Sequence, residues 1–164
     1  MAAVVLAGLA ISSVGSRRRC TFPAAPRLPQ CDKRIILVDM DGTIADFDQR
    51  ALELLQARTQ QSLKQEPSEL CHFPLTKQFQ EHKETLESIY VEENFFNSFK
   101  PIEGAIEALK EMQAHPQLEV FLCTSPIVQS KFCSQEKAEW VRKAFGEDGD
   151  SWVRRLIITS DKSC

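Results

Sequence analysis

Several features that mark specialised proteins are absent from this chain of 164 residues. None of its six cysteines forms a C-x-x-C pair, which argues against a zinc site, and a reduced chain without disulfides is the simplest interpretation. Basic residues do not exceed acidic ones, with 20 against 23, which argues against a general nucleic-acid binder. The apolar run "VVLAGLAI" is too short to cross a membrane. What is present, 43% hydrophobic and 26% charged residues, is typical of one globular domain.

Acidic residues are also missing from the first 31 positions, which contain four arginines. The rest of the chain therefore has 20 − 4 = 16 basic residues against 23 acidic ones, a balance of −7. An Ala-, Ser- and Arg-rich segment without acids predicts a mitochondrial presequence, and the proline-rich "TFPAAPRLPQ" predicts a linker. A secretory signal is the alternative, although its charges would precede the apolar run. A second alternative is an irregular N-terminal tail. We therefore predict a presequence and linker over 1–31 and a folded part over 32–164.

Apolar runs and helical periodicities alternate along the folded part. The apolar runs predict strands at 34–38, 118–125 and 154–162. Helical patterns follow Asp46 and cover 76–95, 100–113 and 134–146, with Ser134 as the N-cap and Gly146 as the C-cap of the last. Strands that are apolar on both faces predict an α/β fold, a parallel sheet covered by helices. Residues 48–98 are then a small helical cap inserted after the first strand.

Polar side chains stand at the end of each predicted strand. They are Asp39 and Asp41, then Thr124 and Ser125, then Thr159, Asp161 and Lys162. Ligands of open parallel sheets bind beyond the carboxyl ends of the strands, so we expect these residues to form one site.

Two aspartates one residue apart repel each other unless another group offsets their charge. A Mg²⁺ ion would do so, because it prefers oxygen ligands and often bridges carboxylates to phosphate. One ionised aspartate can attack phosphorus, and a second can protonate the departing alkoxide. Gly42 permits the tight turn that brings backbone amides toward a phosphate. The alternative is a simple turn at a strand end, which does not require the second aspartate.

The motif "DMDGT" after an apolar strand resembles the first motif of the haloacid-dehalogenase superfamily. Within it, the segments "LVDMDGTIADF", "KPIEGAIEALKEM", "VFLCTSPI" and "IITSDK" resemble the 5'(3')-deoxyribonucleotidases, from Arg34 to Lys162. With its N-terminal segment, the chain is most similar to the mitochondrial form. The resemblance implies a Rossmann-like sheet and Mg²⁺-dependent hydrolysis of nucleoside monophosphates, above all dUMP and dTMP. It also implies a location in the mitochondrial matrix, with the cytoplasm as the alternative.

The resemblance also implies roles for the first two aspartates. Asp39 would be the nucleophile that forms an aspartyl-phosphate, and Asp41 the acid and then the base. Mg²⁺ would be held by the Asp39 carboxylate and the Asp41 backbone carbonyl. Period-two alternation in an extended segment agrees with this, because it directs both side chains to one face.

Further residues would bind the substrate. Phosphate would be held by Thr124, Ser125, Lys137 and Lys162. Phe47, Phe73 and Phe96 would form an aromatic pocket for a pyrimidine base, with Phe95 as a substitute. The alternatives are turn chemistry for the hydroxyls, a solvated surface for the lysines and a place in the core for the phenylalanines.

The chain departs from the family pattern at three places. Pro74 stands where the family has a bulky apolar residue, and Ser160 where it has arginine. The sequence also stops at Cys164, before the family's fourth strand with its paired aspartates. We therefore expect an incomplete core with the first strand as an open edge, low stability and weak or no activity.

Two other functions stay open at this point. One is a phosphatase of the same superfamily that acts on a sugar phosphate. The other is a non-catalytic fragment that binds a nucleotide or a full-length partner. A homodimer is also open, whereas a nucleic-acid or membrane partner is not expected.

Overall fold

A parallel sheet of three strands forms the centre of the protein, whose structure is a computed structural model that describes residues 33–60 and 74–161. The strands are β1 (Arg34–Val38), β2 (Leu118–Thr124) and β3 (Leu156–Ile158), in the spatial order β1-β2-β3. The register pairs Val38 with Leu122 and Leu122 with Leu156, so these three apolar residues lie in one row across the sheet. The α/β prediction with a parallel sheet is confirmed.

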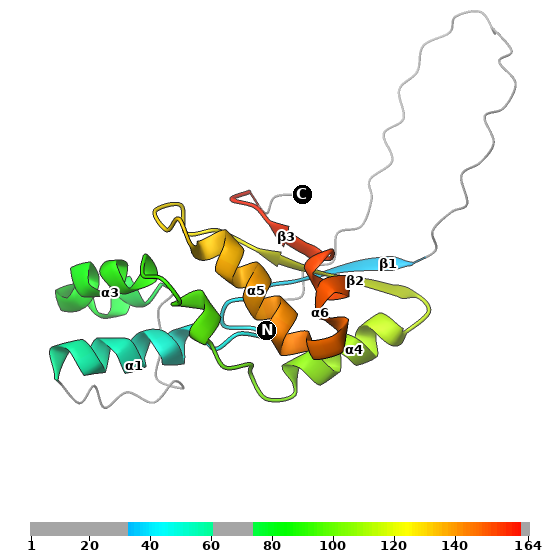
Figure 1. Cartoon of the computed structure of the whole chain (residues 1–164), viewed down its shortest axis with the longest axis horizontal. Coiled ribbons are helices and arrows are strands. Elements are labelled where there is room, and N and C mark those ends of the chain that lie inside the picture. The colour runs from blue at the N-terminus through cyan, green and yellow to red at the C-terminus, as the bar shows by residue number, and fades with distance from the viewer. Residues whose placement is uncertain (1–32, 61–73, 162–164) are drawn as a thin grey trace, which may run out of the picture.

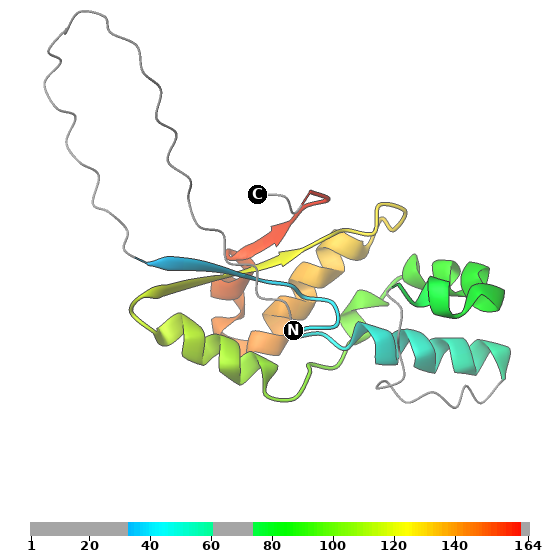
Figure 2. The same ribbon diagram turned by 180° about the vertical axis from the view of Figure 1, so that it is seen from behind.

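The helices form two groups (Figures 1 and 2). One group covers a face of the sheet and the other lies beyond the end of β1. The sheet-covering helices are α4 (Ala105–Ala114), α5 (Cys133–Phe145) and α6 (Gly149–Val153), with the 3-10 turn η4 (Gly146–Asp148) between the last two. The second group contains α1 (Phe47–Thr59), α2 (Leu75–Gln78), η2 (Gln80–His82), α3 (Lys83–Tyr90) and η3 (Phe96–Ser98).

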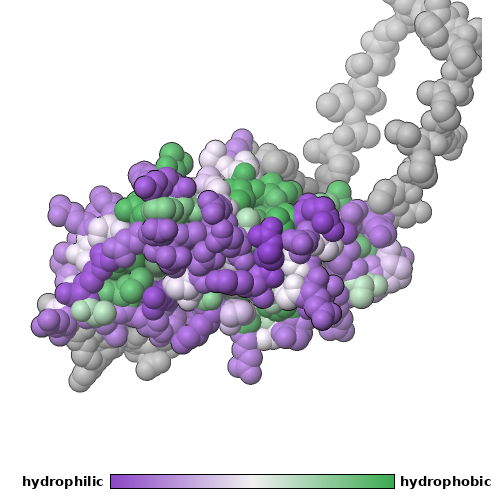
Figure 3. Space-filling view, in the orientation of Figure 1, coloured by the Kyte–Doolittle hydropathy of each residue, from purple (hydrophilic) through white to green (hydrophobic). Residues whose placement is uncertain are grey.

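The three α-helices near the sheet all lie on the same side of it, as both ribbon views show. On the opposite face, Ile35 is 67% exposed, Leu37 44% and Ile157 39%. The expected helix cover is thus present on only one face among the described residues. The expectation that β1 lies at an edge of the sheet is confirmed for these residues. Hydrophobic residues gather beside β3 in Figure 3, whereas hydrophilic ones cover the outer side of the helices.

The segment predicted as one helix over 76–95 is broken in the structure. The break lies at Phe79, whose φ of −111° and ψ of 64° are not helical. Its buried ring belongs to the core, and its backbone N–H donates the last i to i−4 hydrogen bond of α2 to the Leu75 carbonyl. The apolar periodicity agrees with helix α3, but packing of Phe79 in the core overrides local helix propensity.

Two other helix starts differ from the prediction. Helix α5 begins at Cys133 with Phe132 at the cap, so Ser134 is not the N-cap, whereas Gly146 is the C-cap as predicted. Helix α4 begins at Ala105 and not near Lys100, because Gly104 before it has φ of +74°.

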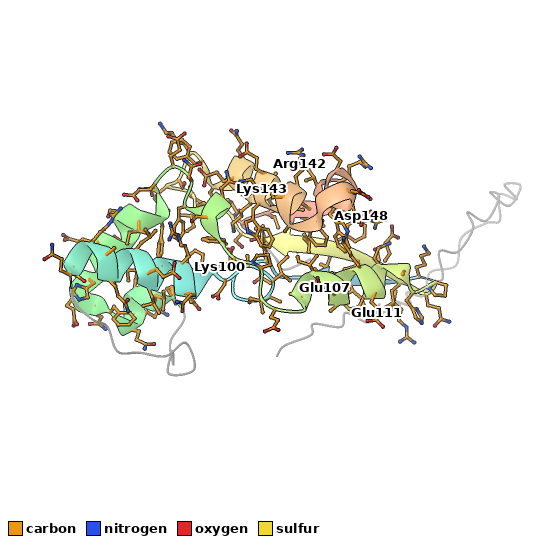
Figure 4. The ribbon with its side chains drawn as sticks, turned by 60° about the horizontal axis from the view of Figure 1, so that its bottom comes forward. Lys100, Glu107, Glu111, Arg142, Lys143 and Asp148 are labelled. Atoms are coloured by element: carbon orange, nitrogen blue, oxygen red, sulfur yellow. The ribbon has the colours of Figure 1, made fainter. Side chains whose placement is uncertain are left out.

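The outer surface of the helix layer is charged. Glu107 and Glu111 on α4, with Arg142 and Lys143 on α5, are exposed and lie on this surface (Figure 4). Within the described residues, no helix is both long and apolar enough to cross a membrane.

Candidate active site

The loop after β1 turns sharply and presents its two aspartates. The carbonyl of Met40 accepts hydrogen bonds from the backbone N–H groups of Ile44 and Ala45, both at 3.0 Å. Gly42, with φ of +70°, allows this turn. Met40 is fully buried, whereas Asp39 is exposed and Asp41 is half-buried. The alternation of the chain therefore places the methionine in the core and leaves the two carboxylates toward the solvent-accessible side.

The end of β2 lies beside this loop, as the strand pairing requires. Thr124 is fully buried, and its carbonyl accepts a hydrogen bond from the Thr159 backbone N–H at 3.0 Å. Ser125 follows as the first residue after the strand and is half-buried. Cys133 adds a support, because its Sγ accepts the Ile127 backbone N–H at 3.3 Å. The ends of β1 and β2 are thus brought together as expected. At the end of β3, the hydroxyl of Thr159 bonds instead to the backbone of Asp161 in an exposed position.

Lys137 of α5 connects these two strand ends. Its side chain is fully buried, and its Nζ donates to Asp41 Oδ2 at 2.6 Å, to Thr124 Oγ1 at 2.8 Å and to the Ser125 carbonyl at 2.8 Å. Nζ also lies 5.4 Å from the centre of the Phe96 ring. A buried ammonium is tolerated only when its charge is paired and its three donors are used, and both conditions hold here.

These contacts bear on the predicted role of Lys137 as a phosphate ligand. An ammonium has three N–H donors, and protein acceptors take all three. Direct phosphate binding by Lys137 stays a prediction that this arrangement does not support. Because α5 begins at Cys133, Lys137 is also beyond the first turn, where a cation would oppose the helix dipole most.

A cavity of about 550 Å³ opens directly beside this cluster. Asp41 and Ser125 line it from the sheet side, and Phe47 and Tyr90 line it from α1 and α3. Gln129 belongs to the loop after β2 that closes a third side. Asp41 and Ser125 thus form a polar end of the cavity and Phe47 and Tyr90 form an aromatic wall. The charged lining residues, Asp41 and Glu87, are both carboxylates.

The aromatic wall is a packed cluster of rings. Phe47 lies 5.2 Å from Tyr90, 5.4 Å from Phe95 and 5.5 Å from Phe99, measured between ring centres. Tilted and edge-on contacts at such distances are favourable, so the rings support one another. The cluster holds Phe47 and Tyr90 in place at the cavity surface.

The predicted pocket residues are found in different places. Phe47 lines the cavity, as does Pro74, one of the family departures. Phe96 is fully buried outside the cavity and packs edge-on against Phe95, 5.1 Å away, so both belong to the support behind the wall. Phe73 and Lys162 lie outside the described residues, and their binding roles stay predictions.

Tyr90 is one of the cavity-lining residues, with Glu87 and Gln129, that the sequence analysis does not single out. It falls within the apolar periodicity of the helix predicted over 76–95. It is 8% exposed, and its hydroxyl has no hydrogen-bond partner among the described residues. It is the chain's sole tyrosine and ends α3, which is the signal that could have drawn attention to it. Burial, aided by the charge of nearby Asp48, raises the pKa of Tyr90 above its ordinary value.

Asp48 lies at the start of α1 behind the same wall. Burial raises the pKa of its carboxyl, and the charges of Asp46 and Asp41 raise it further. Its Oδ1 is buried and has no hydrogen-bond partner within the described part of the chain. The acidic groups near the cavity therefore repel one another, which a bound cation would relieve.

The oxygen donors at the β1 loop fit the chemistry of Mg²⁺. The exposed Asp39 carboxylate receives the Met40 backbone N–H on Oδ1 at 2.8 Å, which fixes its orientation. Mg²⁺ is usually bound by one or two carboxylates with several waters and a substrate phosphate. No group of three or more metal-ligating side chains occurs among residues 33–60 and 74–161. The expected ligands Asp39 and Asp41 thus stay a prediction.

Comparisons with known proteins give a consistent result. Residues 33–163 match the family described as 5' nucleotidase, deoxy (pyrimidine), cytosolic type C protein. The chain is 36% identical over 132 residues to the human mitochondrial 5'(3')-deoxyribonucleotidase, covering 78% of this chain and 57% of that protein. It is 33% identical over 132 residues to the human cytosolic type, covering 78% and 64%. A putative 5'(3')-deoxyribonucleotidase of Bordetella pertussis is 32% identical over 130 residues, covering 79% and 68%. The chain thus spans less than two thirds of the length of the human relatives.

Proposed function

This chain belongs to the 5' nucleotidase, deoxy (pyrimidine), cytosolic type C family, and on that premise we propose that it hydrolyses pyrimidine deoxyribonucleoside monophosphates such as dUMP and dTMP. One observation supports this most strongly. Asp41, held by the buried Lys137, faces a cavity whose opposite wall is formed by Phe47 and Tyr90. The phosphate of a nucleotide would lie at the Asp41 end, where a bound Mg²⁺ would offset the carboxylates. Its base would lie against the aromatic wall, because every base offers a π-face.

In the first step, a carboxylate oxygen of Asp39 attacks the phosphorus of the monoester. The bond from phosphorus to the ester oxygen breaks, and protonated Asp41 gives its proton to that oxygen, so the nucleoside leaves as an alcohol. The product on the protein is an aspartyl-phosphate at Asp39. Lys137 stabilises the carboxylate that Asp41 becomes at this stage, because its ammonium lies 2.6 Å from Oδ2.

In the second step, Asp41 takes a proton from water, and the water oxygen attacks the phosphorus of the aspartyl-phosphate. The bond from phosphorus to Asp39 breaks, inorganic phosphate leaves, and Asp41 carries its proton again. One residue thus serves as acid and then as base. Its position is restrained by Lys137, so the same carboxyl oxygen can reach both reacting oxygens.

Mg²⁺ is the cofactor we propose for this reaction, held by the Asp39 carboxylate and the Asp41 backbone carbonyl. When bound, it would neutralise charge on the phosphate oxygens. Within the protein, Ser125 lies at the same end of the cavity as Asp41, where its hydroxyl and backbone N–H can orient the phosphate.

The decisive experiment measures release of inorganic phosphate from dUMP, dTMP and several sugar phosphates in the presence of Mg²⁺. We expect faster release from the two nucleotides than from the sugar phosphates. Asp39→Asn should lower turnover about a thousandfold or more, because the nucleophile is removed. Asp150→Asn, an exposed change on α6, is the matched control and should leave turnover unaltered.

Other outcomes would replace the proposal. Release from sugar phosphates alone would identify a sugar phosphatase of the same superfamily. Binding of dUMP without turnover, even with excess Mg²⁺, would identify a non-catalytic nucleotide-binding protein. Full turnover by Asp39→Asn would refute the assignment of the nucleophile.

We also propose the mitochondrial matrix as the location, because residues 1–31 have the composition of a presequence. They lie outside the described residues, and the relatives include both mitochondrial and cytosolic types. A fluorescent protein fused to residues 1–31 should accumulate in mitochondria. Substitution of Arg17, Arg18 and Arg19 by glutamate should abolish import, and cytosolic fluorescence of the unmodified fusion would contradict the proposal.

A further inference from the structure

Glu136 is a buried carboxylate that the proposed reaction does not use. It is 4% exposed and directly precedes Lys137 on α5. Its Oε1 accepts the backbone N–H of Asn94 at 2.6 Å, and its Oε2 accepts the backbone N–H of Phe96 at 3.0 Å. A buried charge is costly unless hydrogen bonds compensate it, and here both oxygens are used on one short segment. The carboxylate therefore anchors residues 94–96 to α5.

Other residues of α5 hold the same segment further along. Trp140 donates its Nε1–H to the carbonyl of Phe99 at 2.9 Å, and Glu139 accepts the side-chain amide of Asn97 at 2.8 Å. We call residues 94–99 the anchored segment. It contains the short 3-10 turn η3, which local hydrogen bonds hold, but Asn94 at its start has φ of +67°, a conformation that most residues avoid. The contacts with α5 thus fix where this segment lies against the helix.

The anchored segment packs, through its aromatic rings, against residues that lie at both ends of the cavity. The Phe95 ring lies 5.4 Å from Phe47 and 5.6 Å from Tyr90, the two rings of the cavity wall. The Phe96 ring lies 5.4 Å from Nζ of Lys137, which holds Asp41. Glu136 thus fixes the backbone between a ring that supports the aromatic wall and a ring that contacts the charged end.

We propose that Glu136 is a positioning residue that determines substrate choice by setting the separation of the aromatic wall from Asp41. This inference rests on the proposed nucleotidase function. A nucleotide spans both ends of the cavity, so its binding depends on that separation. A small aryl monoester such as p-nitrophenyl phosphate does not carry a sugar between its ring and its phosphate, and it depends on the separation less.

The test compares Glu136→Gln with the wild type on dUMP and on p-nitrophenyl phosphate. Glutamine retains one acceptor oxygen but presents an NH₂ donor to the second backbone N–H, so one anchor bond is lost. We expect the ratio of kcat/KM for dUMP to that for p-nitrophenyl phosphate to fall about tenfold, chiefly through a higher KM for dUMP. Glu111→Gln, an exposed change on α4 (Figure 4), is the matched control and should preserve the ratio.

A second measurement tests the hydrogen bonds between Glu136 and the anchored segment without an activity assay. Hydrogen exchange of a peptide that covers residues 94–99 should become faster in Glu136→Gln and not in Glu111→Gln. If Glu136→Gln does not fold, Phe95→Leu replaces it, because this variant keeps the anchor but removes the ring between segment and wall. It should lower the same kcat/KM ratio.

The outcomes separate this inference from the proposed function. A wild type that releases no phosphate from nucleotides refutes the proposed function and, with it, the selection that we assign to Glu136. An active wild type combined with an unchanged ratio in Glu136→Gln, or with an equal loss on both substrates, overturns only the inference. Unchanged exchange of residues 94–99 overturns the anchor.

Discussion

Lys137 is the residue on which most polar contacts of the site converge. Its ammonium contacts Asp41, Thr124 and Ser125, which come from two different strand ends, while its own backbone belongs to α5. A lysine at such a place costs folding energy unless every donor is used. The same contacts that make its burial tolerable also fix the orientation of Asp41, so stability and the proposed catalysis would both depend on one side chain.

Replacing Lys137 with methionine tests this double role. The change removes three hydrogen bonds and leaves Asp41, whose side chain is 21% exposed, without its ion-pair partner. We expect the free energy of unfolding to fall by about 3 kcal/mol, the lower end for a broken buried pair. Turnover should fall about a hundredfold. Thermal unfolding and phosphate release provide the two measurements.

Lys143→Met is the matched control for this variant, since Lys143 is exposed on the same helix (Figure 4). It should match the wild type in both measurements. Unaltered turnover of a folded Lys137→Met protein would contradict the positioning of Asp41 by Lys137.

Asp48 provides a test by pH. Burial raises the pKa of its carboxyl above the ordinary value of 3.8, so the folded protein keeps this proton to higher pH than the unfolded chain does. Between the two pKa values the folded state binds more protons, and the unfolding free energy therefore decreases as pH rises. At neutral pH an ionised Asp48 destabilises the fold.

Asp48→Asn should remove this effect, because asparagine resembles the protonated acid in shape and carries no charge. We expect a higher melting temperature than the wild type at pH 7 and a smaller difference below pH 3.8. Melting curves of both proteins across this range provide the measurement. A variant that is less stable at pH 7 would show that the carboxylate has a favourable partner in solution.

At the scale of elements, helix α5 positions the site because it contacts both the sheet and the neighbouring short helices. Its first two turns carry Glu136 and Lys137, and its end packs closely against α6. At Gly149, an added Cβ atom would clash with the carbonyl oxygen of Arg142. The ring of Phe145 stacks on Trp152 at 4.3 Å between centres. The two helices are therefore closely packed against each other.

Gly149→Ala tests the close packing of this pair. The added methyl group meets backbone and not a movable side chain, so α6 must shift away from α5. We expect a loss of about 2 kcal/mol in unfolding free energy, typical of overpacking. The near-ultraviolet circular dichroism, to which Trp152 contributes, should also change. Ser151→Ala, an exposed change on α6, should leave both unaffected.

An unaltered melting temperature in Gly149→Ala would show that α6 can move without cost. The close packing of α5 against α6 would then contribute little to the stability of the fold.

At the scale of the whole molecule, the sheet is covered on one face only within the described residues. The uncovered side carries Ile35, Leu37 and Ile157 in exposed positions, and β1 lies at the sheet edge. An exposed apolar edge strand promotes association with other chains. Low stability stays a prediction, and the exposure of this strand predicts in addition that the protein associates.

Ile35→Lys should weaken such association. Its side chain is 67% exposed, so the lysine can reach water without disturbing the core, and its charge repels a second copy. We expect this variant to scatter less light than the wild type at equal concentration and to have the same melting temperature. Val128→Lys places the same charge at a position that is 80% exposed and outside the strands, and should have no effect. Equal scattering by Ile35→Lys and the wild type would exclude β1 as the contact.

The amino-acid sequence alone was sufficient to predict the parallel α/β sheet, the loop with Asp39 and Asp41 and the meeting of that loop with Thr124 and Ser125. These follow from local patterns, since apolar runs specify strands and parallel strands share their carboxyl ends. The tertiary structure decided which donors Lys137 would use, that Phe96 would lie behind the cavity wall while Tyr90 lines it, and that Phe79 would break a helix. These features depend on contacts between residues far apart in the chain, such as Glu136 with Asn94. Such contacts cannot be predicted from the periodicity of the sequence.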